Sequence, residues 1–110
     1  MQLVIAIVQD EDRKKLADAF TKANVRATRL SSTGGFLKAG NTTFLIGIEK
    51  KRVDEVLEII KKNSQKRIET VPAPVDLDMT LAGLTQTTPV EIEIGGAIVF
   101  VVPVESFHRF

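Results

Sequence analysis

The sequence predicts an α+β protein with the ferredoxin-like βαββαβ arrangement, in which two helices cover one face of an antiparallel sheet. Two observations support this prediction. Short apolar runs rich in β-branched residues alternate along the chain with two segments whose apolar residues recur at helical spacing. The length of 110 residues is that of one domain, which we assign to residues 1–110.

The N-terminal part predicts a strand, a helix and a second strand. Leu3–Val8 is apolar on both faces, as in a buried strand. Asp10 is the expected N-cap of a helix that ends near Asn24, a residue type that tolerates the left-handed conformation of a C-terminal cap. The second strand is expected over residues 25–33. The apolar stripe of the helix consists of Leu16, Ala17, Phe20 and Ala23.

The middle of the chain predicts a third strand, a second helix and a short further strand. Thr42–Ile48 alternates between a fully apolar side and a mixed side, as in a strand with one buried face. A helix that ends near Asn63 follows, and Lys66–Val71 is expected to be a short strand. The apolar residues of this helix are Val53, Val56, Leu57 and Ile60.

The C-terminal part predicts a long loop and two final strands. Residues 72–89 contain three prolines and no apolar period, and they exceed the length of an ordinary connection. Val90–Ile94 alternates apolar residues with glutamates, which predicts a half-exposed strand. After a turn at Gly95–Gly96, Ala97–Val102 forms a wholly apolar last strand.

These strands also predict an oligomer. Two helices cover one face of the sheet, yet Leu3–Val8 and Ala97–Val102 are apolar on both faces. A second face left in water would expose more apolar surface than the few hundred Å² that soluble monomers tolerate. The alternative is a long loop folded over that face, but the one long loop is too polar for this role.

Composition and charge exclude several classes of function. The net charge is +1, with 15 basic and 14 acidic residues, whereas duplex DNA binding needs a concentrated basic face. The absence of cysteine excludes disulfides and thiolate chemistry. The first apolar run is too short for a signal peptide or a membrane span, so we expect a cytoplasmic protein without membrane contact.

No catalytic constellation stands out. The one histidine, His108, is near the C-terminus and does not build a zinc site or a triad without partners. Glu91 and Glu93 share one face of a strand and are better explained as a solvated face than as an acid and base pair. The glycines match neither a P-loop nor a dinucleotide fingerprint. We therefore expect neither enzymatic activity nor a metal or cofactor.

The glycine loop, residues 34–41, contains the clearest candidate for ligand binding. Glycines allow close approach of the backbone, and Phe36 is an aromatic ring in a loop, which offers a stacking surface for a base. Asn41 has a donor and an acceptor on one planar amide, which matches the edge of adenine. The residues alone leave another interpretation open, a hairpin whose Phe36 packs into its own core.

The segment Thr33–Leu45 (TGGFLKAGNTTFL) closely resembles the signature of the PII-like cyclic-di-AMP receptors, a family of signal-transduction proteins. Four further segments are also similar to this family: Ile5–Asp10, Asn24–Thr28, Gly95–Ala97 and Phe107–His108. The resemblance implies a PII-like form of the fold, a homotrimer, and cyclic di-AMP bound as a second messenger in three clefts between the subunits.

The resemblance also implies a set of ligand-binding positions. In this sequence they are Asn24, Arg26, Thr28, Gly35, Phe36, Leu37, Asn41 and Gly47. The penultimate position usually has Gln in the family and is Arg109 here, a guanidinium that suits a phosphodiester. Arg26 and Arg109 would balance the phosphates, Phe36 would stack, and Asn41 would recognise the base. We expect loop movement as the output, with residues 72–89 as the surface for an unidentified downstream protein.

The alternative function is a single-stranded RNA-binding module, because ferredoxin-like sheets with exposed aromatic residues bind unstacked bases. The RNP-type pattern is absent, and the predicted strands offer aliphatic rather than aromatic surface. A small trimeric enzyme is a third possibility, which the lack of catalytic groups disfavours.

Overall fold

A computed structural model describes residues 1–32, 40–72 and 89–110. Expectations for the remaining residues, including Gly35, Phe36 and Leu37 and most of the long loop, lie outside the described residues. Along the chain the elements are β1 (Gln2–Gln9), η1 (Asp10–Asp12), α1 (Arg13–Lys22), β2 (Thr28–Ser32), β3 (Asn41–Ile48), η2 (Lys50–Arg52), α2 (Val53–Asn63), β4 (Arg67–Pro72), β5 (Pro89–Ile94) and β6 (Ala97–Pro103).

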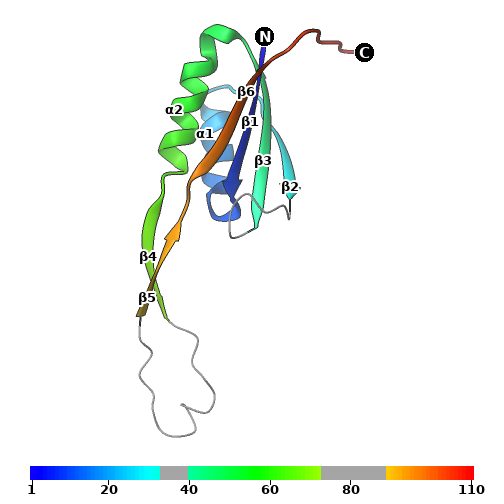
Figure 1. Ribbon diagram of the computed structural model, residues 1–110. Helices are drawn as coiled ribbons and strands as arrows, with labels where there is room; N and C mark the ends of the chain where they lie inside the picture. The colour runs from blue at the N-terminus through cyan, green and yellow to red at the C-terminus, as the bar shows by residue number, and fades with distance from the viewer. Residues whose placement is uncertain (33–39, 73–88) are drawn as a thin grey trace, which may run out of the picture.

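Four of these strands form an antiparallel sheet in the order β2-β3-β1-β6. Both helices lie on one side of this sheet, as the ferredoxin-like prediction requires (Figure 1). β4 and β5 pair separately in a two-stranded antiparallel hairpin, which we call the arm. The arm projects beyond the end of the sheet (Figure 1).

The fourth strand of the main sheet is therefore β6, and the predicted strand at residues 66–71 belongs to the arm. β1 has apolar residues on both faces, and β6 is the other strand with this character, so their pairing keeps apolar side chains together on both sides. Gly95 (φ 86°) and Gly96 (φ 92°) let the chain turn from the arm into the sheet. β5 is more exposed than predicted, since only Ile94 is buried.

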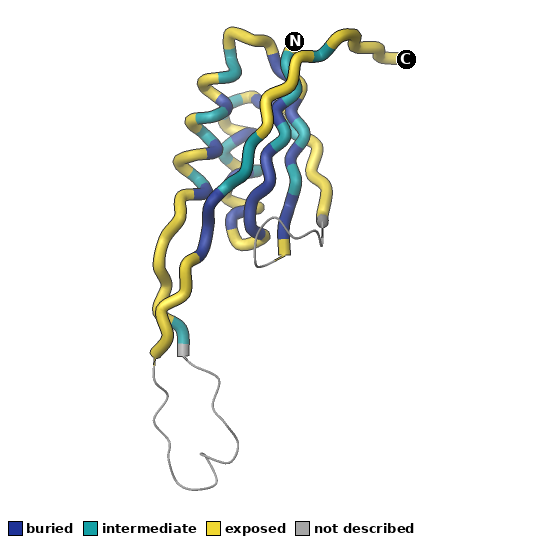
Figure 2. Tube along the Cα trace, in the orientation of Figure 1, coloured by how far each residue is buried: buried dark blue, intermediate teal, exposed yellow. Residues whose placement is uncertain are grey.

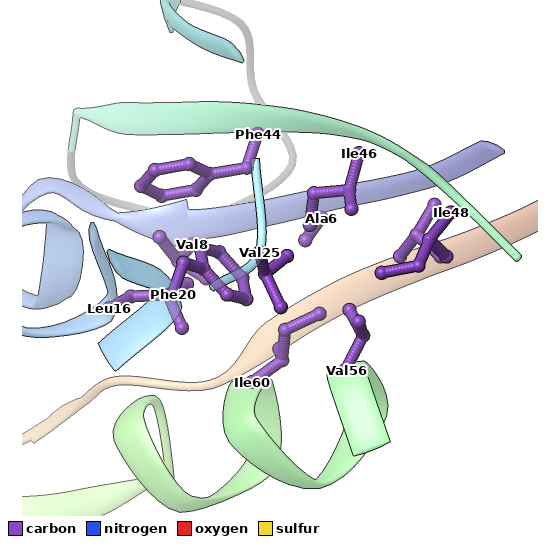
Figure 3. Packing of buried hydrophobic residues seen from close by; sticks show 11 residues of the cluster. Ala6, Val8, Leu16, Phe20, Val25, Phe44, Ile46, Ile48, Val56 and Ile60 are labelled. Carbon is purple, nitrogen blue, oxygen red and sulfur yellow. The ribbon is translucent and has the colours of Figure 1, made fainter. Parts of the chain in front are cut away.

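The core lies between the sheet and the helices, where the buried side chains of β1 and β3 meet those of α1 and α2 (Figures 2 and 3). Phe20 and Phe44 pack edge to face, with ring centroids 5.5 Å apart, an arrangement that adds about 0.5–1.5 kcal/mol beyond burial. The core consists of Val4, Ala6, Val8, Leu16, Phe20, Val25, Phe44, Ile46, Ile48, Val56 and Ile60.

Helix α1 ends as predicted, with Asn24 in the left-handed conformation at φ 56°. The Asn24 N–H donates to the Thr21 carbonyl at 3.1 Å, and the Val25 N–H donates to the Phe20 carbonyl at 2.8 Å. These two bonds form a Schellman motif, and the buried side chains of Val25 and Phe20 provide its apolar contact. β2 begins at Thr28, three residues later than predicted, because this motif and the chain leaving it occupy residues 23–27.

The predicted N-cap role of Asp10 is wrong. Asp10 opens the short 3-10 turn η1, and the residue at the N-cap position of α1 is Asp12, whose side chain makes no capping hydrogen bond. The Asp10 carboxylate instead accepts a hydrogen bond from Thr42 Oγ1 at 2.6 Å. Asp10 thus contacts a residue that is distant in sequence instead of capping the helix that follows it.

No helix of residues 1–32, 40–72 and 89–110 lies on the second face of the sheet, which is apolar, as the two-faced strands predicted. Alternation and strand register place on this face Leu3, Ile5, Leu30, Leu45, Phe100 and Val102. Three of them are about half exposed: Leu30 at 48%, Phe100 at 46% and Val102 at 42%. We call this surface the open face.

Candidate functional site

A groove of about 750 Å³ lies where the end of α1, the start of β2, the end of β3 and the C-terminal tail come together. Among the described residues, its lining combines apolar side chains with two arginines and includes no aspartate or glutamate. The lining residues are Met1, Thr21, Asn24, Val25, Arg26, Ala27, Thr28, Leu45, Gly47, Phe107 and Arg109.

Five of the nine residues that the sequence singled out line this groove. They are Asn24, Arg26, Thr28, Gly47 and Arg109. Three others lie outside the described residues, and Asn41 does not line the groove. β3 has 8 residues and begins at Asn41, so at ~3.3 Å per residue Asn41 and Gly47 are separated by about 20 Å. The Asn41 side chain is also buried, with 2% exposure.

The local structure explains why Asn24, Arg26 and Thr28 face the groove together. The Schellman motif turns the chain out of α1 and anchors Val25 in the core. The extended chain that follows alternates sides, so the odd-numbered residues point inward while the three polar residues stay exposed. Side chains therefore alternate here as they do in a strand, although residues 24–27 are not part of one.

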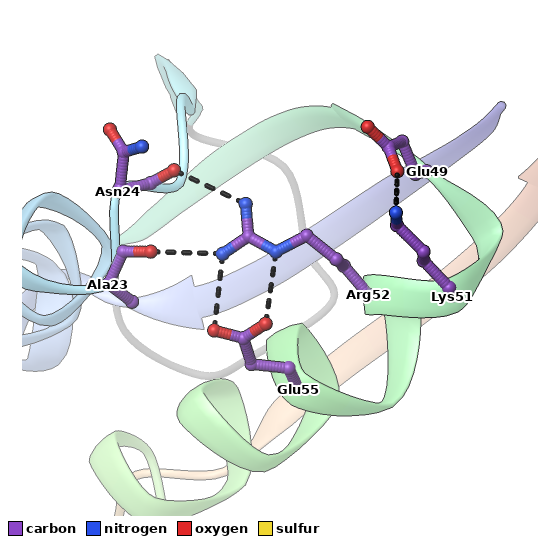
Figure 4. A network of polar contacts seen from close by, with 6 residues as sticks. All are labelled: Ala23, Asn24, Glu49, Lys51, Arg52 and Glu55. Atoms are coloured by element: carbon purple, nitrogen blue, oxygen red, sulfur yellow. Dashed lines mark hydrogen bonds and ion pairs between the residues drawn. The ribbon is translucent and has the colours of Figure 1, made fainter.

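Arg52 holds this wall from the side of α2 (Figure 4). Its guanidinium donates to the Ala23 carbonyl at 2.9 Å and the Asn24 carbonyl at 3.4 Å, and it pairs with both oxygens of Glu55 at 3.0 and 3.1 Å. The hydrogen bond from Arg52 lowers the pKa of Glu55 below its usual value, and the same bond raises the pKa of Arg52. The Arg52 cation thereby satisfies carbonyls at the C-terminal end of α1 and stabilises the partial negative charge of the helix dipole there.

The C-terminal tail forms the opposite side of the groove. The Val104 N–H donates to the Met1 carbonyl at 3.2 Å, which extends the pairing of β6 with β1 beyond Pro103. Phe107 and Arg109 then line the groove. Sequence reasoning did not select Met1 or Phe107 as site residues. The sequence did contain a signal for Phe107, because it is an aromatic residue beyond the last predicted strand and two residues before the selected Arg109.

The electrostatics of the groove favour an anion. Within the described part of the chain, Arg26 and Arg109 form no ion pair, whereas Arg52 and Arg67 both pair with carboxylates. Two guanidiniums without a facing carboxylate attract phosphate groups, for which the planar fork of arginine is well suited. The groove is thus a candidate site for a small phosphate-bearing ligand.

The turn between β1 and α1, residues 9–12, contacts the chain that leaves the glycine loop. We call this turn the corner. The Asp10 N–H donates to the Gly40 carbonyl at 2.9 Å, and the Asp10 carboxylate accepts from the Thr42 hydroxyl. Two successive contacts therefore link the corner to the first residues of β3 and the residue before them.

The corner also holds the root of the arm. Asp12 is buried, and its carboxylate accepts from Arg67 of β4 at 2.8 and 3.3 Å. This hydrogen bond raises the pKa of Arg67. The Gly95 N–H, at the end of β5, donates to the buried Gln9 side chain at 2.6 Å. The same short turn therefore contacts β4 and the residue that directly follows β5.

Other kinds of site have little support in the structure. No group of three His, Asp or Glu residues in residues 1–32, 40–72 and 89–110 is arranged to hold a metal ion. His108 is exposed and stacks on Phe110, with ring centroids 6.2 Å apart. Glu91 and Glu93 are exposed, and Glu93 pairs with Lys66 at 3.6 Å. No described helix combines the length and the apolar character needed to cross a bilayer.

Comparison with known proteins places this fold and sequence in context. The chain is similar to a functionally unknown protein from Pediococcus pentosaceus ATCC 25745, for which a crystal structure is known. The two sequences are 52% identical, and the match has a TM-score of 0.77 and covers 99% of this chain and 96% of that chain. The fold is also that of Arabidopsis thaliana PII bound to citrate, at 17% identity and a TM-score of 0.63, over 98% of this chain and 78% of that chain. This second likeness confirms the predicted PII-like fold.

The family assignment comes from the sequence of the whole chain. The sequence pattern of the cyclic-di-AMP receptors matches residues 1–110. A match of this extent includes the glycine loop, both helices, the arm and the C-terminal tail. The protein belongs to the cyclic-di-AMP receptor family.

Proposed function

We propose that this protein is a cytoplasmic receptor that binds cyclic di-AMP between the subunits of a homotrimer and signals by rearrangement of its loops, without catalysing a reaction. The observation that supports ligand binding most directly is the pair of guanidiniums, Arg26 and Arg109, in a groove whose described lining includes no carboxylate. Cyclic di-AMP has two phosphodiesters, and two cations balance that charge.

A site shared between subunits explains the distribution of the predicted residues. Asn41 lies about 20 Å along β3 from Gly47. One ligand meets both ends of β3 most readily if the two ends belong to neighbouring subunits. The open face supplies an apolar surface for such contacts, since Leu30, Phe100 and Val102 are exposed in the single chain. The number of three subunits follows from the resemblance to the PII-like receptors.

The adenine contacts are proposed for the glycine loop and Asn41. Phe36 would stack on one base, backbone groups of Gly35 and Leu37 would border it, and the Asn41 amide would recognise its edge. Because the Asn41 side chain is only 2% exposed, contact with a base requires movement of the chain around it. Ligand binding and loop rearrangement would then be one event.

The corner supplies a physical link for the signal. Asp10 contacts Gly40 and Thr42 at the end of the glycine loop, and the next-but-one residue, Asp12, holds Arg67 of the arm. A shift of the loop would therefore act on the root of the arm through residues 9–12. Residues 72–89, which connect the two strands of the arm in the sequence, are the proposed surface for the downstream protein.

Calorimetric titration with cyclic di-AMP, cyclic di-GMP, ATP and a short single-stranded RNA tests this function. We expect cyclic di-AMP to bind best, because guanine presents an acceptor where adenine presents its amino group. Arg26→Gln should weaken binding about 10- to 150-fold, as loss of a charge-assisted hydrogen bond costs ~1.5–3 kcal/mol. Arg29→Gln is the matched control, since Arg29 is exposed on β2 but does not line the groove.

Two further results would contradict the proposal. Light scattering should give three times the 12.1 kDa mass of one chain, and a monomer at micromolar concentration would exclude the shared site. Preferential binding of RNA would favour the alternative function. The open face makes that outcome unexpected, because Phe100 is the one aromatic residue among its described members.

A further inference from the structure

The arm is a hairpin whose two strands both have an open edge. In the part of the chain that the structure describes, β4 and β5 pair only with each other. A hairpin of two strands is marginally stable in water unless a further strand or another element packs against it. The arm is exposed along most of its length, and Ile94 at its root is buried (Figure 2). An additional strand would therefore stabilise it.

The side chains of β5 follow a strict two-residue alternation. Val90 and Ile92 lie on one side of the hairpin and are 42% and 39% exposed. Glu91 and Glu93 lie on the other side and are exposed as well. Lys66 pairs with Glu93, but this contact is long, at 3.6 Å, and exposed, so it contributes little. The open edge of β5 thus has one apolar side and one acidic side.

We propose that the open edge of β5 binds an extended segment of the downstream protein in which lysine or arginine alternates with apolar residues. The segment would pair with β5 as a third strand of the arm. Residues that are opposite each other in neighbouring strands share one side, so the apolar residues of the segment would cover Val90 and Ile92. Its cations would lie beside Glu91 and Glu93. This inference rests on the proposed function and identifies the chemistry of the partner.

Charge argues against a second copy of this chain at the same edge. Two β5 strands that paired with their apolar residues together would also bring their glutamates together, where like charges repel. None of the described strands alternates lysine or arginine with apolar residues. The occupant of the edge is therefore a strand of a different protein.

The root of the arm connects this edge to the proposed signal. The Gly95 N–H, directly after β5, donates to the buried Gln9 side chain at 2.6 Å. On the other strand, Arg67 donates to the buried Asp12 carboxylate at 2.8 Å. Both acceptors belong to the corner, so a shift of the corner would move the edge that the partner recognises.

Two-dimensional NMR of the full chain, titrated with a peptide in the absence of cyclic di-AMP, tests the proposal. The probe is a short acetylated peptide in which lysine and valine alternate. We expect it to shift the backbone amides of residues 90–94 and to give nuclear Overhauser contacts with β5. A peptide of the same composition, with its lysines grouped before its valines, should bind more weakly. A peptide with glutamate in place of lysine should not bind.

A pair of charge reversals on the two strands identifies the edge that is used. Glu91→Lys replaces an attractive cross-strand pair with a repulsive one, and we expect the affinity for the alternating peptide to fall about 2- to 30-fold. Glu69→Lys is the matched control. Glu69 is also exposed on the arm, but it belongs to β4, one strand farther from the peptide, so this variant should bind nearly as well as the native protein.

Three results would refute binding at this edge. If the alternating peptide does not bind, the glutamates serve only to protect an open edge from aggregation. If the grouped peptide binds equally well, charge alone attracts it and no strand is added. If Glu91→Lys and Glu69→Lys have equal affinities, the peptide does not pair with β5. A native protein that binds the peptide but not cyclic di-AMP would instead contradict the proposed function, while the binding edge would stand.

Discussion

Replacing Arg67 with methionine tests how firmly the corner holds the arm. The Asp12 carboxylate is 2% exposed and accepts from Arg67 at 2.8 and 3.3 Å, so the variant leaves a buried charge without its cation. Loss of one partner costs about 3–5 kcal/mol in a fully buried pair and about 0–1 kcal/mol in an exposed one. Because 41% of the Arg67 side chain is exposed, water partly compensates, and we expect a loss of about 2–3 kcal/mol.

Urea unfolding followed by far-ultraviolet circular dichroism measures this loss. All variants must be compared at one protomer concentration, because the stability of an oligomer depends on it. Lys66→Met is the matched control. Lys66 is the neighbouring residue, and its pair with Glu93 is long, at 3.6 Å, and exposed on both sides, so its loss should cost less than about 1 kcal/mol.

A double-mutant cycle with Asp12→Asn identifies the cause of the effect. The two substitutions should not be additive, since each removes the same contact, and we expect a coupling energy above about 1 kcal/mol. Equal losses of unfolding free energy in Arg67→Met and Lys66→Met would show that the corner does not hold the arm through this pair. Additive losses in the double-mutant cycle would show the same.

Two further predictions concern the glycine turn and the groove. Gly95→Ala should lower the free energy of unfolding by at least about 1–2 kcal/mol, because φ is 86° and the new Cβ would lie 2.3 Å from the Gln65 carbonyl oxygen. Gly47→Ala is the control and should change thermal unfolding little, since its new Cβ would come no closer than 3.8 Å to the Met1 sulfur. Equal effects of the two substitutions would contradict this account. Asn24→Gly fits the φ of 56° and should keep native stability within about 0.5 kcal/mol while weakening cyclic di-AMP binding in calorimetry; native affinity would mean that Asn24 serves the helix end alone.

Most secondary structure followed from the sequence because its causes are local. The 3.6-residue period of α2 and the two-residue period of β3 are properties of short segments, and both elements have nearly the predicted bounds. The same holds for Asn24, whose tolerance of the left-handed conformation ends α1. The side of the chain that Asn24, Arg26 and Thr28 share was also predictable, since alternation around a buried Val25 determines it.

The partners of these segments were decided by the tertiary structure. Asp10 was assigned to a local cap, but the Thr42 hydroxyl, which is distant in sequence, offered a better partner for its carboxylate. Asp12 is buried beside Arg67 and pairs with it, a contact that no local pattern indicated. Hydrogen bonds between such distant residues depend on strand pairing, which no local period encodes.

The site shows the same division. From the sequence, through its resemblance to a family, we selected nine candidate ligand-binding residues, and five of them line one groove. Only the tertiary structure added Phe107 to that groove and separated Asn41 from it, at the far end of β3. The physical reason is the pairing of β6 with β1, which brings the C-terminal tail beside Met1 and the end of β3.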